Sequence, residues 1–299
     1  MKQILNKYLS LLFFIGFIVN TSYAGGKESE SSNLMMASDY YGSYSISLGQ
    51  LDWNKNTNTA SNEPMLYQPI SIDGWLGKKL SQYTEGVLSF KYTYYGRSGN
   101  TGQPEDDGVR HALNANLLHL RHYSSSTSYI NLGYVFSEEN ESGNSNGNMN
   151  SYIASGGLAT ESMIFELGIA STASETRSYY ADEIVYYNFS YKLPITNRIN
   201  LLASKHYSEY ERKLREETYD GEEMDISGLK VTYDLNDSFI TLGGDRYTVK
   251  NDSSPENTGG SVYFSWTVPF GKLPNSRTSF ILDNRPAVDR VIGFGSALN

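Results

Sequence analysis

The chain of 299 residues contains no cysteine. We therefore expect neither a disulfide framework nor thiolate chemistry, although the N-terminus predicts export. The chain has one long apolar run, near its start, and beyond that run no segment could cross a bilayer as a helix. The formal net charge is −9, so the chain is a poor candidate for binding nucleic acid. These absences exclude thiol enzymes and helical membrane proteins.

The first 24 residues have the parts of a secretory signal peptide. Lys2 and Lys7 precede the apolar core LSLLFFIGFIV, and Ser22 and Ala24 form a small-residue cleavage site. A membrane-anchoring helix is the alternative, but this core is too short to span a bilayer. Cleavage after Ala24 would take the net charge from −9 to −11, because both lysines are lost.

Apolar and polar residues alternate through most of the remaining chain, which is the period of a β-strand. In the segment 183–194, Val185 and Phe189 fall on one face, and Asn188 and Lys192 fall on the other. Most of the alternating segments have the length that a tilted strand needs to cross a membrane. The pattern predicts twelve strands, at 42–53, 66–79, 86–96, 110–123, 127–138, 150–160, 162–172, 183–194, 197–208, 224–235, 238–249 and 260–270.

The connections between these strands alternate in length. The short ones are LSQYTEG, SSST, TES, PIT and LNDS. The long ones are rich in Asn, Ser, Gly and Glu, and the charge spacing of one of them would allow a short helical turn. They lie at 54–65, 97–109, 139–149, 173–182, 209–223 and 250–259. Transmembrane barrels show this alternation, with short periplasmic turns, long extracellular loops and an even number of strands.

The last predicted strand reads SVYFSWTVPF and ends on an aromatic residue. One face of it carries Val262, Phe264, Trp266, Val268 and Phe270. Together with the signal peptide and the loop pattern, this strand resembles the closing strand of Gram-negative outer-membrane β-barrel proteins. The resemblance is to the class as a whole and covers roughly residues 40–270. The chain departs from the class because further residues follow the closing strand.

The resemblance implies an all-β fold, an antiparallel up-and-down transmembrane barrel of about twelve strands in the cell outer membrane. It also implies contact with outer-membrane lipid and lipopolysaccharide, and recognition of the closing strand by the barrel-assembly machinery. A soluble β-sandwich is the alternative, because alternation does not show which face points inward. The expected divisions are a signal peptide at 1–24, a polar segment at 25–41, the barrel at 42–270 and a C-terminal extension at 271–299.

Polar residues opposite the apolar faces are expected to line the barrel interior. Lys or Arg on the lipid face would cost about 2–4 kcal/mol at mid-depth, so charged residues favour this phase. The lumen-lining candidates are Asp73, Lys91, Asn114, Asn116, Glu166, Lys192, Arg198, Lys230, Asp234 and Asp245. Their mixed charge argues against a strongly ion-selective channel. A narrow pore and a filled interior both fit a barrel of this size.

No catalytic residue, metal site or cofactor site is predicted. His111 and His206 fall near the expected extracellular rim, close to Asp106, Asp107 and Ser208. Acyl hydrolysis needs a serine held by an oriented histidine, and no nucleophile motif surrounds either histidine. The acidic loops lack the spacing of an EF-hand.

The tail 271–299 contains the apolar pieces SFIL and RVIGFG. It could add two strands, plug or cover the periplasmic mouth, or bind a periplasmic partner, and the last two interpretations are favoured. The predicted function is a narrow or gated channel or export component, for small polar solutes or a secreted product. The alternatives are a surface-exposed structural or interaction protein, adhesin or receptor-like, that works through long acidic extracellular loops, and, less favoured, a rim-active hydrolase.

Overall fold

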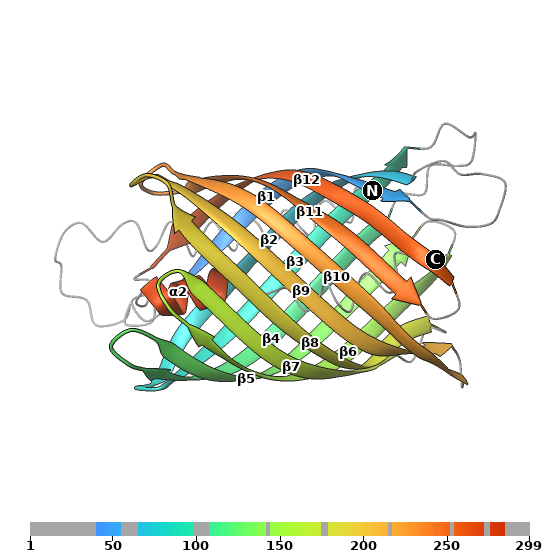
Figure 1. Cartoon of the computed structure of the whole chain (residues 1–299), viewed down its shortest axis with the longest axis horizontal. Helices are drawn as coiled ribbons and strands as arrows, with labels where there is room; N and C mark the ends of the chain where they lie inside the picture. Colours follow the sequence, from blue (N-terminus) through green and yellow to red (C-terminus); the bar gives the residue numbers. More distant parts are fainter. Residues whose placement is uncertain are drawn as a thin grey trace, which may run out of the picture.

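The computed structural model describes residues 40–54, 65–98, 108–141, 144–174, 179–214, 217–251, 254–271 and 276–284. Its strands form a closed barrel in which every neighbouring pair is antiparallel (Figure 1). The strands are β1 (Tyr40–Asn54), β2 (Met65–Ser81), β3 (Thr84–Ser98), β4 (Gly108–His122), β5 (Thr127–Glu141), β6 (Asn144–Ala159), β7 (Met163–Ala173), β8 (Tyr179–Pro194), β9 (Ile199–Leu214), β10 (Glu217–Asp234), β11 (Phe239–Asn251) and β12 (Ser254–Phe270). The predicted twelve-stranded up-and-down barrel is confirmed.

The first and last strands close the barrel. Phe270 of β12 pairs with Gly42 of β1, so SVYFSWTVPF is the closing strand, as predicted. Val262, Phe264 and Trp266 project outward from it and are exposed. A closed barrel leaves no sheet edge with unpaired backbone groups.

The outer face of the wall is mainly apolar, whereas alternate residues point inward. This is the reverse of a soluble sandwich, which buries its apolar face. Exposed outward residues include Ile130, Leu132 and Tyr134 on β5, Met163, Phe165, Leu167 and Ile169 on β7, and Val185, Phe189, Tyr191 and Leu193 on β8. Such a face is suited to lipid.

Tight turns join the strands at one end of the barrel, which we call the turn end; the opposite end is the loop end. The turns comprise residues 82–83, 123–126, 160–162, 195–198 and 235–238. In the last of them Asn236 has a positive φ of 79°, and its N–H donates to Asp234 Oδ1 at 2.7 Å.

At the loop end the strands are longer than predicted. β9 continues to Leu214 and β10 starts at Glu217, so most of 209–223 is strand, and the possible helical turn there is wrong. Most of 139–149 and 250–259 is likewise strand. The charged residues and asparagines of these segments predicted loops because their side chains favour water. They also suit a hairpin whose side chains reach water while the ladder pairs its backbone groups.

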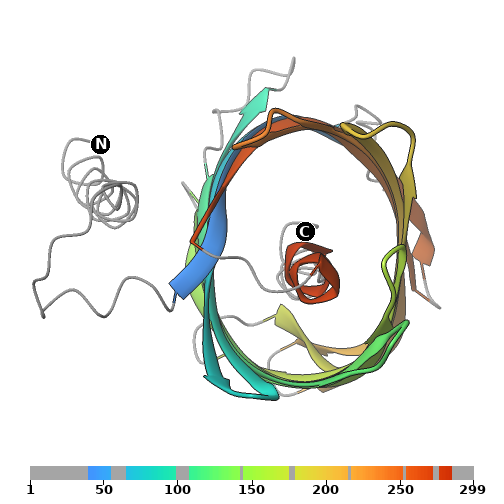
Figure 2. The same ribbon diagram turned by 90° about the vertical axis from the view of Figure 1, so that its left-hand side faces the viewer.

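One described part of the tail is α-helical. Helix α2 (Ser276–Asn284) lies inside the ring of strands at the turn end (Figures 1 and 2). The interpretation of this part as an extra strand is therefore wrong. No helix of the described residues is long and apolar enough to span a membrane. The predictions for 1–24, 25–39 and 285–299 fall outside the described residues.

Candidate functional site: the lumen and its helix

Helix α2 packs against the inner wall through three consecutive apolar residues. Phe280, Ile281 and Leu282 are buried, and Ile281 is 0% exposed. They join a cluster of inward-facing residues that we call the turn-end cluster. Its wall members are Tyr41, Val87, Leu118, Leu120, Tyr129, Ala159, Ile164 and Leu202, with Trp75 at its edge. Burying one such side chain contributes about 1.5–3 kcal/mol, so this contact is the main hold on the helix.

Polar contacts tie the first turn of α2 to two turns of the barrel. Arg277 Nη1 donates to the Tyr123 carbonyl at 2.9 Å, in the turn after β4. Arg277 Nε lies 3.3 Å from Glu161 Oε1, in the turn after β6. Ser276 Oγ donates to the other oxygen of Glu161 at 2.7 Å. The start of the helix is therefore fixed to the rim of the turn end.

The other end of α2 is held by β2 and β8. Trp75 Nε1 donates to Asp283 Oδ1 at 3.1 Å. The Lys192 ammonium lies 4.7 Å from the centre of the Phe280 ring, a cation–π contact. Enclosure by the wall raises the pKa of Asp283 to about 6, while Trp75, Lys230 and Lys192 oppose the rise. Asp283 is nevertheless exposed to water, which weakens the effect of enclosure and of each neighbouring charge on its pKa.

His122 lies at the end of β4, and its pKa depends in part on Arg277 of α2. It lies beyond the lipid-facing residues of that strand, and its Nδ1 is 3.0 Å from Thr127 Oγ1. Partial burial lowers its pKa, and the nearby charges of Arg277 and Lys79 lower it further, against an opposing effect of Glu85. Removing the helix removes the Arg277 contribution.

The inner wall carries a second apolar layer toward the loop end, which we call the loop-end cluster. Its members are Val135, Met149, Ile153, Ala170, Ile184, Tyr186, Tyr210, Met224, Ile226, Tyr247 and Val249, with Leu51 against it. Glu166 lies between the two layers and is 1% exposed. It accepts hydrogen bonds from Tyr129 of one cluster at 2.7 Å and from Tyr186 of the other at 3.1 Å. The sequence pattern indicated a polar lumen. The structure shows instead two apolar layers with a polar region between them.

Tyrosine hydroxyls donate to carboxyl groups at two other inward positions. Tyr210 donates to Glu222 at 2.9 Å, and Tyr41 donates to Glu85. Burying the ring while its hydroxyl finds an acceptor satisfies both parts of the side chain. Part of the tyrosine content of the sequence therefore lies on the inner wall.

Most of the predicted lumen residues lie on inward-facing strand positions. Asp73 and Lys91 are paired in register on β2 and β3. Asn116 Nδ2 donates to Asn114 Oδ1 at 2.8 Å. The other inward positions are those of Glu166, Lys192, Lys230, Asp234 and Asp245.

Two of the candidates lie at turns, Asp234 as the last residue of β10 and Arg198 within a turn. Asp234 binds the backbone of the turn after β10. Arg198 lies in the turn after β8 with an exposed side chain, and its carbonyl accepts the Asp234 N–H at 2.8 Å. The strand that was predicted to begin at 197 begins at Ile199.

The two candidate histidines lie on opposite faces of the wall. His111 faces outward, with Nε2 2.9 Å from Glu138 Oε2. His206 faces inward, is buried, and bonds Asn188 through Nδ1. Ser208 Oγ has no hydrogen-bond partner, so Ser208 does not form the pair with His206 that acyl hydrolysis would need. Asp106 and Asp107 lie outside them.

The described residues also hold no cluster of three or more His, Cys, Asp or Glu that could bind a metal ion. Two features were not predicted from the sequence: the tyrosine–carboxyl pairs of the lumen and a polar hollow on the outer wall. The pairs join residues far apart in sequence, so only the abundance of tyrosine pointed to them. The hollow could have been found from the sequence, because Lys205 and Arg246 interrupt the apolar alternation of their strands.

No family model and no curated protein sequence matches the chain. Among solved structures, it is similar to an outer-membrane channel from Pseudomonas putida F1, with a TM-score of 0.57 and 10% identity over 81% of this chain and 100% of that one. The translocator domain of the autotransporter NalP from Neisseria meningitidis has a TM-score of 0.44 at 8% identity, covering 89% of this chain and 98% of that one. The KdgM porin has a TM-score of 0.41 at 11% identity, covering 76% and 99%. The closed barrel and the likeness to the Pseudomonas putida channel together give the chain the fold of the outer-membrane β-barrels.

Proposed function

We propose that the protein is an outer-membrane channel for small solutes whose periplasmic mouth is restricted by helix α2. The observation that carries the proposal is the position of α2 inside the ring of strands at the turn end (Figure 2). In outer-membrane barrels the short turns face the periplasm. The likeness to the Pseudomonas putida channel supports this reading through the shared fold.

The contacts of α2 are suited to a movable element. Three apolar residues of a short helix and a few polar contacts at its two ends hold it, whereas every wall strand is paired on both sides. Elements with few contacts open at lower free energy than the sheet around them. The helix can therefore leave its position while the barrel stays intact.

The side chains that line the lumen favour solutes with both polar and apolar parts. A solute that passes along the lumen meets an apolar layer, the polar region around Glu166, and a second apolar layer. Such a path suits small polar molecules that also carry an apolar part. The interaction-protein alternative depends on long acidic extracellular loops, but most of 139–149, 209–223 and 250–259 is paired strand. The segments 55–64 and 99–107 lie outside the described residues.

The absence of cysteine permits a direct test. We suggest Ser276→Cys with Glu161→Cys, joined by a short, reducible, thiol-specific cross-linker, because the two native side chains touch. Single-channel conductance in planar bilayers should be low with the bridge and should rise after reduction. The matched control joins Ser45→Cys and Thr267→Cys, which are paired across β1 and β12 and do not restrain α2.

Two results would contradict the proposal. One is conductance that does not change when the bridge between α2 and the rim is reduced. The other is the absence of any pore in both forms, which would also remove the channel itself. The flux of sugars into liposomes is then measured against the flux of small aromatic acids, to find which class of solute passes.

A further inference from the structure

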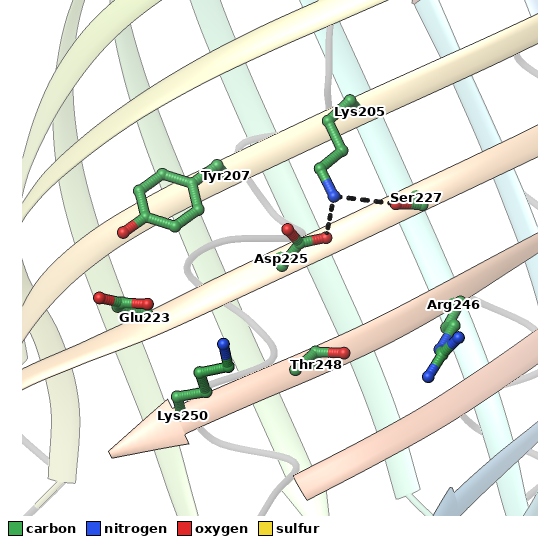
Figure 3. A pocket seen from close by; sticks show the side chains of 8 residues that line it. All are labelled: Lys205, Tyr207, Glu223, Asp225, Ser227, Arg246, Thr248 and Lys250. Atoms are coloured by element: carbon green, nitrogen blue, oxygen red, sulfur yellow. Dashed lines mark hydrogen bonds and ion pairs between the residues drawn. The ribbon is translucent and has the colours of Figure 1, made fainter. Parts of the chain in front are cut away.

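A polar hollow lies on the outer wall of the barrel, on β9, β10 and β11. It has a volume of about 300 Å³. The side chains of Figure 3 line it: Lys205, Tyr207, Glu223, Asp225, Ser227, Arg246, Thr248 and Lys250. The residues between these positions are buried on the inner side, including His206, Met224, Ile226 and Tyr247. The hollow therefore faces away from the lumen.

The hollow begins where apolar residues would be expected. Lys205 is paired with Phe189 of β8, which is the centre of the outward apolar series from Val185 to Leu193. On β10 the outward residues below the hollow, Leu229 and Val231, are apolar and exposed. Charged residues on the lipid face destabilise a barrel. Lys205 and Arg246 therefore lie at the border between the apolar wall and the charged loop end.

The wall itself compensates one of the charges. Lys205 Nζ lies 2.5 Å from Asp225 Oδ1 and 3.1 Å from Ser227 Oγ (Figure 3). Arg246 and Lys250 stand on β11 with Thr248 between them. No ion pair joins either cation to a carboxylate among the residues described here. The lining thus has three cationic groups, two carboxylates and three hydroxyls.

We propose that this hollow binds the phosphorylated sugar headgroup of lipopolysaccharide. Arg246 and Lys250 contact phosphate, where charge-assisted hydrogen bonds are strong. The Thr248 hydroxyl and the Glu223 carboxylate bond sugar hydroxyls. The Tyr207 hydroxyl donates to Glu209 Oε1 at 3.0 Å and can accept from the sugar. The hollow lies toward the loop end, beside apolar wall that suits acyl chains. This inference rests on the outer-membrane placement proposed above, with the loop end outward.

The test uses the full-length mature protein in detergent and lipopolysaccharide, with binding followed by native mass spectrometry. Arg246→Gln with Lys250→Gln should weaken binding about tenfold or more, because each lost charge-assisted contact is worth about one order of magnitude. The matched control is Lys78→Gln with Arg121→Gln, which removes two outward cations near the turn end. This control should bind as the unmodified protein does.

Three further ligands show which molecule supplies the phosphate that the hollow binds. Lipopolysaccharide stripped of its phosphates should bind as weakly as the Arg246/Lys250 variant, and phosphatidylglycerol or inorganic phosphate alone should not compete at equal concentration. Equal binding by the two double variants would overturn the proposal. So would a dimer that dissociates in the Arg246/Lys250 variant without any loss of lipopolysaccharide, since the hollow would then be an interface between two copies. Heat-modified mobility on gels verifies that each variant is folded, and channel conductance tests the proposed function separately.

Discussion

Trp75 of β2 and Asp283 of α2, far apart in sequence, are joined by a hydrogen bond of 3.1 Å from indole Nε1 to Oδ1. Trp75→Phe keeps most of the ring packing with Tyr41 but removes the donor. Loss of this exposed, charge-assisted bond should cost about 1 kcal/mol of helix docking, which is about a fivefold rise in the undocked fraction. Single-channel recordings should show more open time. Trp266→Phe, on the outward face of β12, is the control and should leave gating unchanged.

A second prediction concerns pH. The pKa of Asp283 is raised from 3.8 to about 6 with the helix docked, so docking takes up a proton. This contribution to docking is fully present below pH 3.8 and is lost as the pH rises through 6. His122 acts in the opposite direction, because its pKa is lowered. Asp283→Asn keeps an acceptor for Trp75 and removes the titration.

The comparison between the unmodified protein and Asp283→Asn therefore isolates this carboxyl. At neutral pH the variant should be more closed than the unmodified protein, and the two should converge as the pH falls below 4. The measurement is open probability between about pH 3 and pH 8. Parallel curves for both proteins would show that Asp283 does not set the pH response.

A third prediction concerns the rim contact between Arg277 and Glu161. Exposed ion pairs contribute about 0.2–1 kcal/mol, and a double-mutant cycle measures that coupling. Arg277→Gln should loosen the helix, and the His122 pKa measured by NMR should rise toward its ordinary value. Arg277→Glu with Glu161→Arg should recover part of the docking. Arg121→Gln is the control. It removes a neighbouring cation that does not contact α2, so it should leave the His122 pKa unaltered.

The barrel was predictable from the sequence because its signals are local. Alternation along one strand, such as Val185 to Leu193, already separates the two faces of the wall. The loop-end hairpins were missed because charged residues near Glu217 suit both a loop and a strand in water. The hold on α2 was missed because Trp75 and Asp283 meet only after the barrel has closed. The sequence did indicate that SFIL could pack, but not onto which wall.

A fourth prediction tests the polar centre of the lumen. Glu166 accepts from both Tyr129 and Tyr186 while almost fully buried. Glu166→Leu would remove the carboxylate that accepts from two buried hydroxyls, and should cost about 2–4 kcal/mol in urea titrations of folding into vesicles. Adding Tyr129→Phe and Tyr186→Phe to the Leu variant should recover part of the loss. A triple variant less stable than Glu166→Leu would contradict this account. Asp237→Asn, in an exposed turn, is the control.

The last prediction concerns closure of the barrel at Gly42. A Cβ at this position would overlap the carbonyl oxygen of Trp75 and come within 2.8 Å of Phe270 Cζ, so both neighbours would have to move. Gly42→Ala should therefore destabilise the β1–β12 seam by about 1–3 kcal/mol. Gly260→Ala is the matched control, because its Cβ would meet only the Asp245 carbonyl oxygen at 3.5 Å. The folded fraction, read from the mobility of unheated samples on gels, should fall for Gly42→Ala and stay unchanged for Gly260→Ala. An equal folded fraction for both variants would show that the close approach at the seam does not limit assembly.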